Sequence, residues 1–496
     1  MTRLRQSDTD ACPGALRLHA AADGLLARVR LPGGLLSGAQ LRSLRELAEE
    51  FGDGRLELTS RANLQLRALK AEQAETLAAR LRDAGLLPSS THDAVRNIAA
   101  PPLADDRIRR AVGELDAAIC ADPALAALPG KFLFAIGPVP LAADVAALPA
   151  GRGFALRFGG HDTGLRVGAE RVVEALVVAA HAFLAERSAQ RPADASGAAW
   201  RLRELTGGPA RVSARVAAAL GITAAAVTAA GLTAGNVRAS SVMTDSVTTG
   251  DATAAGVTAG SVTTAAAAEG VEPGGLVGVV TGNGQFAAGA LVPLGRLEGV
   301  QLRALEDAER LVVTPWRGVL VPGLTRAAAE GRVERMAAAG LVVTATSRWT
   351  GVSACAGRPG CAKSLADVRA EADAATRFVK DGLPVHWVGC DRACGSPAVS
   401  HVRVEATPAG FEVTRRTAAG APLGDPALGA AAETTALDEP AATTGLGKLT
   451  AAETTGPGEP AAATGSGGPA AATGSGEPPA AEATGLGELV AGARRA

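Results

Sequence analysis

The sequence has few cysteines, few aromatic residues and almost no net charge. Among its 496 residues are 6 cysteines, 4 tryptophans, 9 phenylalanines and no tyrosine, and the formal net charge is −1. This balance gives no global basic field for nucleic acid and no solvating acidic tail. Scarce cysteine indicates a reducing compartment, where clustered cysteines hold metal more often than they form disulfides.

Long apolar runs are also missing. The opening MTRLRQSDTD is polar, and no apolar segment of a signal peptide follows it. The uncharged stretch between Arg215 and Arg238 consists mainly of Ala, Thr and Gly, which transfer weakly into hydrocarbon. We therefore expect a cytoplasmic protein without a membrane segment and without a nucleic-acid partner.

Two segments contain too few large apolar side chains to offset the entropy of ordering. Residues 207–284 are rich in Ala, Thr, Val and Gly, and residues 417–496 repeat AAETT and AATGSG. The composition predicts a low-complexity linker and a disordered tail. Deletion of the tail is then expected to leave activity and thermal stability nearly unchanged.

The remaining sequence repeats itself. GLLSGAQLRSL (34–44) matches GRLEGVQLRAL (295–305), LELTSR (56–61) matches LVVTPWR (311–317), and LRDAGLL (81–87) matches MAAAGLV (336–342). Three matches in the same order indicate a duplicated unit. Each unit reads as an amphipathic helix, a strand, a second helix ending at glycine, and further strands. This pattern predicts an α+β fold with two halves related by a pseudo-two-fold axis, and ligands often bind between such halves.

Four of the cysteines form two close pairs. Five residues separate Cys355 from Cys361, and three separate Cys390 from Cys394. The flanking residues Gly357, Gly360, Gly389, Gly395, Pro359 and Pro397 supply a backbone that can approach the sulfides of an iron–sulfur cluster. Structural zinc is the alternative, but it prefers two Cys-x₂₋₄-Cys pairs, and the first pair is too widely spaced. These cysteines therefore predict a [4Fe–4S] cluster.

The spacing Cys-x₅-Cys followed by Cys-x₃-Cys resembles the arrangement of cysteines in the sulfite and nitrite reductase family. LTSRANLQLR (58–67) resembles the strand of that family that contacts its iron tetrapyrrole, sirohaem, and VRNI (95–98) and LPGKFLF (128–134) resemble its Arg-Asn and Lys-Phe-Lys segments. The resemblance implies ferredoxin-like halves and a tetrapyrrole cradle. The implied cradle residues are Arg61, Asn63, Gln65, Arg96 and Asn97, with Arg28, Arg30 and Arg317 as weaker candidates.

The resemblance also implies a division of the chain. Its segments are a first half-domain (10–72), a tetrapyrrole-binding domain (73–206), the linker (207–284), a second half-domain (285–328), a [4Fe–4S] domain (329–416) and the tail (417–496).

One residue separates this sequence from the reductases. Arg61, Arg96 and Lys131 match three of the four cations in the family's anion pocket, and we take them as the catalytic candidates. The second lysine of Lys-Phe-Lys is Leu133 here, so one charge and one proton donor are missing. This departure disfavours sulfite or nitrite reduction.

Three phrases resemble a branch of the family that acts on precorrin-3A in aerobic cobalamin biosynthesis: CPGALRLHAAADGLLARVRLPGG (12–34), ELTSRANLQLR (57–67) and VTPWRGVLV (313–321). In that branch the tetrapyrrole is the substrate. The resemblance implies O₂-dependent hydroxylation at C20 and closure of a γ-lactone, with electrons from NADH through a reductase partner and the cluster. It also implies a mononuclear non-haem iron.

The ligands of that iron cannot be read from the sequence. None of the six histidines has the spacing of a known metal motif, and His92 with Asp93 is the best candidate by proximity to Arg96. A sirohaem-dependent reductase, and an electron-transfer or metal-binding protein with no substrate, remain as alternative functions. The cradle argues against the second alternative, because a carrier needs no carboxylate-binding cleft.

Overall fold

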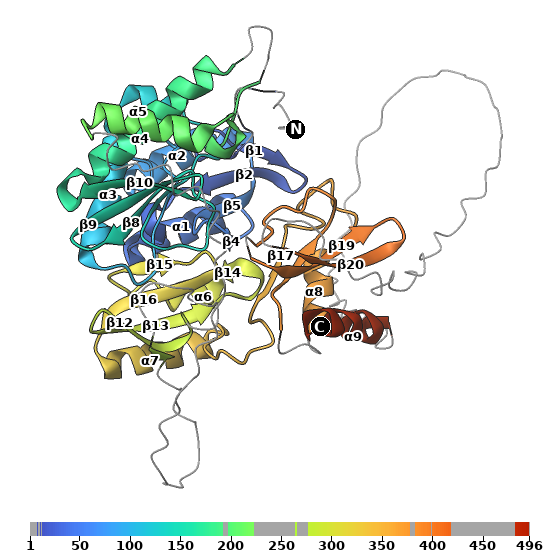
Figure 1. Ribbon diagram of the computed structural model, residues 1–496. Helices are drawn as coiled ribbons and strands as arrows, with labels where there is room; N and C mark the ends of the chain where they lie inside the picture. Colours follow the sequence, from blue (N-terminus) through green and yellow to red (C-terminus); the bar gives the residue numbers. More distant parts are fainter. Residues whose placement is uncertain are drawn as a thin grey trace, which may run out of the picture.

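The computed structural model describes residues 7, 10, 12–191, 197–222, 263–264, 276–376, 382–397, 399–417 and 482–495. Two sheets form its centre (Figure 1). The first has the order β1 (His19–Ala21), β2 (Gly24–Val29), β5 (Leu64–Leu69), β4 (Arg55–Leu58) and β14 (Arg296–Glu298). The second has the order β11 (Thr263–Thr264), β12 (Gly278–Gly282), β13 (Gln285–Leu291), β16 (Gly318–Leu324), β15 (Leu311–Val313) and β3 (Leu35–Leu36).

The two sheets are built alike. The order β2-β5-β4 in the first corresponds to β13-β16-β15 in the second. Helices α1 (Gly38–Phe51) and α2 (Ala74–Asp83) belong to the first half, and α6 (Gly299–Arg303) and α7 (Arg326–Ala338) belong to the second. The predicted duplicated α+β fold is confirmed. The second half differs in its first helix, which is much shorter than α1.

One strand of each half pairs with the sheet of the other half. Strand β14 of the second half pairs with β4, placing Leu297 opposite Leu56. Strand β3 of the first half pairs with β15, placing Leu36 opposite Leu311. This reciprocal exchange follows the pseudo-two-fold axis, because β3 and β14 occupy the same position just before the first helix of each half.

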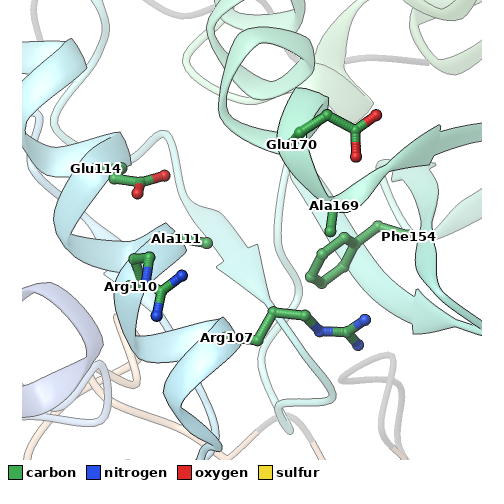
Figure 2. Close-up of a pocket in the computed structure, with 7 residues that line it drawn as sticks. All are labelled: Arg107, Arg110, Ala111, Glu114, Phe154, Ala169 and Glu170. Atoms are coloured by element: carbon green, nitrogen blue, oxygen red, sulfur yellow. The ribbon is translucent and has the colours of Figure 1, made fainter.

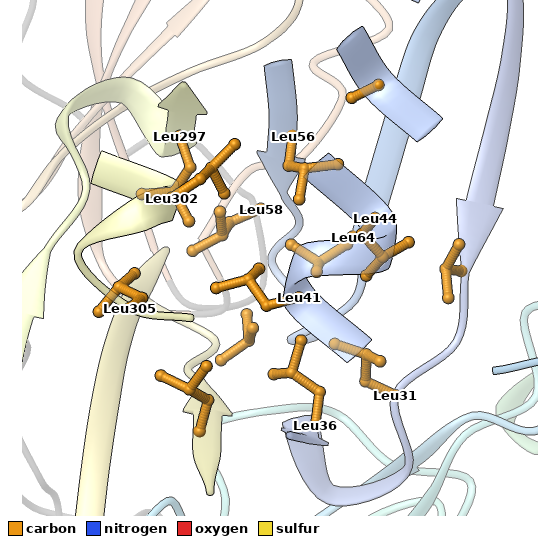
Figure 3. Packing of buried hydrophobic residues seen from close by; sticks show 14 of the residues in the cluster. Leu31, Leu36, Leu41, Leu44, Leu56, Leu58, Leu64, Leu297, Leu302 and Leu305 are labelled. Atoms are coloured by element: carbon orange, nitrogen blue, oxygen red, sulfur yellow. The ribbon is translucent and has the colours of Figure 1, made fainter. Parts of the chain in front are cut away.

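A single hydrophobic core joins the halves. Leu297, Leu302 and Leu305 of the second half are at most 1% exposed and belong to one cluster with the leucines of β4 and α1 (Figure 3). Burial of one leucine contributes roughly 1.5–3 kcal/mol. The two halves therefore fold as one body.

A third sheet follows the first half in the chain. Its order is β10 (His161–Gly168), β9 (Gly153–Phe158), β8 (Val145–Ala150), β7 (Phe134–Ile136) and β6 (Ile98–Ala99). Helices α3 (Asp106–Ala121), α4 (Val172–Ala189) and α5 (Gly208–Ala219) pack against it, and Asp105 caps α3 by accepting from the backbone N–H of Ile108.

The fourth sheet carries the cysteines. Its strands β17 (Val352–Ala354), β18 (Val385–Val388) and β19 (His401–Thr407) are parallel, and β20 (Gly410–Arg416) pairs antiparallel with β19. Helices α8 (Val368–Thr376) and α9 (Glu482–Arg495) lie together against it (Figure 1). The remaining short 3₁₀ turns include Pro32–Gly34, Ala71–Gln73, Pro123–Ala127, Ala169–Arg171, Leu202–Glu204 and Pro293–Gly295.

Several predicted boundaries are wrong. The boundary after residue 72 precedes α2, although Leu77 and Leu81 belong to the core of the first half, and the boundary at 329 cuts α7. The predicted linker contains α5 and β12, because Val212 and Val216 of α5 are fully buried against the third sheet's core.

The predicted tail also contains order, in α9. Residues 418–481, and residues 223–262 and 265–275 of the predicted linker, lie outside the described part of the chain. No helix within the described ranges is long and apolar enough to cross a membrane.

Candidate functional site

Arg61 stands on a tight turn between β4 and β5. The hydroxyl of Thr59 accepts from the backbone N–H of Arg61 at 3.3 Å and of Asn63 at 3.0 Å, and Ala62 takes a positive φ of 56°. The Asn63 side chain in turn accepts from the Leu31 N–H at 2.9 Å. These bonds fix the turn, so the Arg61 side chain leaves the backbone in a defined direction.

Two further arginines come from the neighbouring strand. Arg28 and Arg30 are two residues apart on or just after β2, and such residues share one face of a strand. Gln65 lies directly opposite Arg28, and its carbonyl oxygen accepts from Arg28 Nε at 3.0 Å and Nη2 at 2.5 Å. Gln65 therefore holds Arg28 in place.

The three arginines have few partners of their own. Arg30 is 2% exposed, yet its Nε and Nη1 have no hydrogen-bond partner within the described residues. Arg61 has no side-chain hydrogen bond or ion pair within the same ranges. Burial, with neighbouring cations, lowers the pKa of Arg30 to about 9 and that of Arg61 to about 10. Buried cations without carboxylates call for anionic groups from a ligand, so this cluster fits the carboxylates of a tetrapyrrole.

Cys12 borders the same arginines. Burial and Asp10 raise the pKa of its thiol, while Arg28 and Arg30 oppose that rise. An open cavity of about 330 Å³ adjoins it, lined by Ser7, Asp10, Cys12, Pro13, Arg17, Leu18 and His19. We call Arg28, Arg30, Arg61 and Gln65 the arginine cradle.

The other predicted cradle residues make contacts within the protein. Arg96 is 4% exposed and binds Asp116 through two 2.7 Å hydrogen bonds, from Nε and Nη2. The Asn97 amide donates to the carbonyl oxygens of Ala94 and Gly130. The side chains of Arg96 and Asn97 are therefore engaged within the polypeptide.

Lys131 and Leu133 lie beside Trp200 and Arg201, which belong to no recognisable motif. Lys131 Nζ is 4.8 Å from the centroid of the Trp200 ring. Leu133 is 3% exposed, and its N–H donates to Asp144, which also binds Arg201. The Arg201 charge contributes to the lowered pKa of Arg61, after desolvation. Arg201 is thus a cation near the cradle, neutralised by Asp144, and no spacing motif marks it.

The cysteines gather at one edge of the fourth sheet. Cys355 directly follows β17, and Cys390 follows the parallel strand β18 after one residue, so both lie at the carboxyl ends of paired strands. Cys361 and Cys394 are on the loops that continue from these strands. The Gly389 N–H donates to Cys355 Sγ at 3.3 Å. Burial raises the pKa of Cys394, and Cys355, Cys390 and Cys361 each add to that rise, so the four thiols are electrostatic neighbours.

The placement of the four thiols is compatible with a four-iron cluster. Within the described ranges, no group of three or more His, Cys, Asp or Glu residues is placed to hold one metal ion. Zinc with Zn–S bonds of about 2.3 Å would draw its ligands closely together. A four-iron core accepts a wider set of thiolates, and the backbone N–H at Cys355 Sγ is the kind of hydrogen bond such sulfurs receive.

The residues suggested for a mononuclear iron are engaged elsewhere. His92 contacts Ser89 and Thr91 through Nδ1 and the carbonyl oxygen of Asp122 through Nε2. Asp93 accepts from the N–H groups of Ala15 and Leu16. These residues do not fit an iron site, because their polar atoms are already bound within the protein.

Contacts from the first half fix the cysteine loops. Arg67 donates to the carbonyl oxygen of Gly360 at 2.5 Å and pairs with Asp23.

A buried histidine of the fourth sheet contacts the second cysteine loop. His386, fully buried on β18, contacts Ser353 through Nδ1 at 2.8 Å and the carbonyl oxygen of Cys394 through Nε2 at 3.0 Å. Burial lowers the pKa of His386 to about 3, so this side chain is neutral.

A second cavity of about 310 Å³ lies between α3 and the start of α4 (Figure 2). The residues that line it are Arg107, Arg110, Ala111, Glu114, Phe154, Ala169 and Glu170. The Arg107 guanidinium lies 4.7 Å from the centroid of the Phe154 ring. None of the predicted site residues lines it.

Comparison with known proteins gives matches in the first half. Residues 19–84, from β1 to the end of α2, match the family model described as the nitrite/sulfite reductase ferredoxin-like half domain. The ferredoxin–nitrite reductase of Leptolyngbya laminosa is 42% identical over 79 residues, which is 16% of each chain. The precorrin-3B synthase of a Sinorhizobium species is 42% identical over 74 residues, 15% of this chain and 16% of its own. The chain thus matches about a sixth of the length of these curated relatives.

One solved structure extends the likeness to most of the fold. The Mycobacterium tuberculosis NirA protein has a TM-score of 0.57 and 21% sequence identity, and the match covers 79% of this chain and 74% of that one. At this identity the likeness concerns the fold. The chain therefore shares its fold with the NirA protein, and its residues 19–84 match the ferredoxin-like half domain described for nitrite and sulfite reductases.

Proposed function

We propose that the chain is a precorrin-3B synthase, an oxidoreductase that hydroxylates the tetrapyrrole precorrin-3A at C20 and closes a γ-lactone from a ring acetate. One atom of O₂ enters the product, and the other leaves as water with two electrons and two protons. The electrons come from NADH through a reductase partner. The proposal draws on the three phrases at 12–34, 57–67 and 313–321 and on the Sinorhizobium relative.

The residue that favours this function over sulfite or nitrite reduction is Leu133. Its 3% exposed side chain stands where the Lys-Phe-Lys segment of the reductases has a second lysine. An apolar, buried side chain supplies neither a positive charge for a small dianion nor a proton for a leaving oxygen. The pocket can still bind a macrocycle with many carboxylates through the arginine cradle.

The cradle residues have distinct tasks in this reaction. Arg61 and Arg30 bind substrate carboxylates with charge-assisted hydrogen bonds, and Gln65 keeps Arg28 aligned beside them. Fixing the macrocycle in this way presents one edge to O₂ and brings the acetate near the hydroxylated carbon. Cys355, Cys361, Cys390 and Cys394 would hold a [4Fe–4S] cluster, which passes electrons one at a time when bound.

A sirohaem-dependent nitrite reductase is the second candidate. Two of the relatives are ferredoxin–nitrite reductases, from Leptolyngbya laminosa and Synechococcus elongatus, at 42% and 40% identity. The same cradle suits the carboxylates of sirohaem. The two functions differ in whether the tetrapyrrole is a resident cofactor or a substrate.

Absorption spectra of anaerobically purified protein separate the candidates. Resident sirohaem gives intense bands, whereas a cluster alone gives a broad shoulder. With precorrin-3A and ¹⁸O₂, we expect one labelled hydroxyl oxygen, while the lactone ring oxygen stays unlabelled because it comes from the acetate. Rapid reduction of sulfite or nitrite, or turnover without O₂, would overturn the proposal.

A further inference from the structure

Arg317 occupies a turn that repeats the Arg61 turn in the second half. The N–H of Arg317 donates to the carbonyl oxygen of Thr314, as the N–H of Ala62 does to Thr59. Arg317 has a positive φ of 58°, close to the 56° of Ala62. Such values are uncommon outside glycine. Because an alanine adopts the same conformation in the first half, the turn imposes it, and the arginine is placed on a fixed backbone.

Two glycines make room for the Arg317 side chain. A Cβ atom added to Gly295 would lie 2.7 Å from Arg317 Cδ, and one added to Gly395 would lie 3.0 Å from Arg317 Nη2. Both distances are too short for an alanine to fit without movement. The side chain thus runs over the turn that precedes β14 and ends against the loop that carries Cys394.

The guanidinium has no counterion of its own. Within the described part of the chain, Arg317 has no side-chain hydrogen bond and no ion pair. Glu57 is in electrostatic range, but it is bound to Arg369 at 2.6 Å. Enclosure by protein and the Arg369 charge lower the pKa of Arg317 to about 10, while Glu57 and Cys355 oppose that effect. The Arg317 side chain is half-buried, and a partly desolvated cation without a carboxylate is stabilised when a ligand supplies negative charge.

Because Glu57 is already paired with Arg369, the cysteine site is the remaining source of such charge near Arg317. Four thiolates on a [4Fe–4S]²⁺ core carry a net charge of about −2, and one-electron reduction makes it about −3. A cation beside Cys355 and Cys394 favours the more negative state.

We propose that Arg317 is a positioning residue that balances the charge of the cluster and raises its reduction potential. This inference rests on the cluster assignment made above and not on the identity of the oxidised substrate. One electron enters the cluster, and no bond is formed or broken at Arg317. Arg61, a cradle residue with Arg201, Cys12, Asp144 and Arg28 in electrostatic range, is the matched control.

A potentiometric titration followed by electron paramagnetic resonance tests the proposal on full-length protein purified anaerobically with its cluster. For Arg317→Gln we expect the equilibrium constant for one-electron reduction to fall at least tenfold, which lowers the midpoint potential by at least about 59 mV. Arg317→Lys, which keeps the charge, should stay near the wild-type potential. Arg61→Gln should also keep that potential but bind uroporphyrin, an octacarboxylate macrocycle, at least tenfold more weakly.

An unchanged potential in Arg317→Gln overturns the inference. So does a potential that falls equally in Arg317→Gln and Arg317→Lys, because geometry and not charge would then be responsible. If Arg317→Gln fails to retain a cluster, the potential of Arg317→Lys still decides, since a large fall there contradicts the charge-balancing role. A failure to oxidise precorrin-3A, with the potential shift present, would refute the proposed substrate and leave this inference standing.

Discussion

Arg369 Nη1 donates to Glu57 Oε1 at 2.6 Å, and this buried ion pair joins α8, beside the cysteine loops, to β4 of the first half. Burial alone would raise the pKa of Glu57, but Arg369 and Arg67 outweigh it and hold the pKa below its usual value. Arg369 also donates to the carbonyl oxygen of Cys355 at 3.1 Å. The pair therefore connects the cradle-bearing sheet to the first cysteine.

Glu57→Gln should destabilise the protein by about 3–5 kcal/mol, because it leaves a buried guanidinium without its carboxylate. Urea unfolding followed by tryptophan fluorescence, to which the fully buried Trp387 on β18 contributes, would measure this change. The double variant Glu57→Gln/Arg369→Met should recover part of the loss.

The exposed pair Arg55–Glu298 is the control, since it also links the halves, through β4 and β14. Its side chains are 41% and 57% exposed, so Glu298→Gln should cost under about 1 kcal/mol. Equal effects of Glu57→Gln and Glu298→Gln would contradict the role given to burial.

The duplication was predictable because both halves need the same local chemistry. Thr59 and Thr314 each accept from a backbone N–H four residues later, and this turn requires a Thr at a fixed place in both repeats. The exchange of β3 and β14 was not predictable, because pairings across more than 200 residues leave no periodic signal in a single sequence.

The site was predictable to the extent that its motifs are local. The arginine cradle and the four cysteines follow from short phrases. Arg96 was expected in the cradle, but its planar bidentate pair with Asp116 depends on how α3 packs, which no spacing reveals. Helices α5 and α9 were missed because most of their buried residues are small, and alanine, valine and glycine also mark low-complexity sequence.

Replacing Cys355, Cys361, Cys390 or Cys394 with alanine should abolish iron–sulfur absorption, because each supplies one of four thiolates at the same sheet edge. Cys12→Ala and Cys120→Ala are the controls. Cys12 borders the arginine cradle, and Cys120 lies on α3, so neither replacement should reduce the iron content. Full cluster occupancy in Cys390→Ala would refute the assignment.

Glu186 gives a pH-dependent test of the packing of α5. Its carboxylate, 2% exposed on α4, accepts from Arg211 Nε at 2.6 Å and Arg215 Nε at 2.5 Å, both on α5. The hydrogen bond from Arg215, followed by that from Arg211, lowers the pKa of Glu186 from 4.5 to about 2. The stabilisation is therefore complete above pH 4.5 and is lost as the pH falls towards 2.

Glu186→Gln should cost about 1–2 kcal/mol at pH 7, a value reduced because both arginines are half-exposed. Thermal unfolding at several pH values should show wild type and variant converging in acid. Glu174→Gln, in an exposed pair with Arg171, should show no such convergence. Coincident curves for Glu186→Gln and wild type would mean that the contact with α5 contributes nothing, and curves with a constant offset would mean that its contribution does not come from the ionised carboxylate.

Helix α9 reverses the expectation that the last eighty residues are dispensable. The N–H of Leu383 donates to the carbonyl oxygen of Arg494 at 2.9 Å, and Arg415 Nε donates to that of Ala493 at 2.8 Å. Val490 is 2% exposed in the core of the fourth sheet. Because Leu383 leads into β18 and β18 leads to Cys390, α9 braces the strand that positions half of the cysteine site.

Val490→Asp should therefore destabilise the cysteine-bearing sheet by at least about 2 kcal/mol, since it buries a charge without a partner. The melting temperature should fall by about 4 °C or more, and the iron–sulfur absorption should bleach faster in air. Glu488→Ala, at an exposed position of the same helix, should change stability by less than about 0.5 kcal/mol. If Val490→Asp melts and bleaches like the wild type, α9 does not brace the sheet, and the original view of a dispensable tail holds.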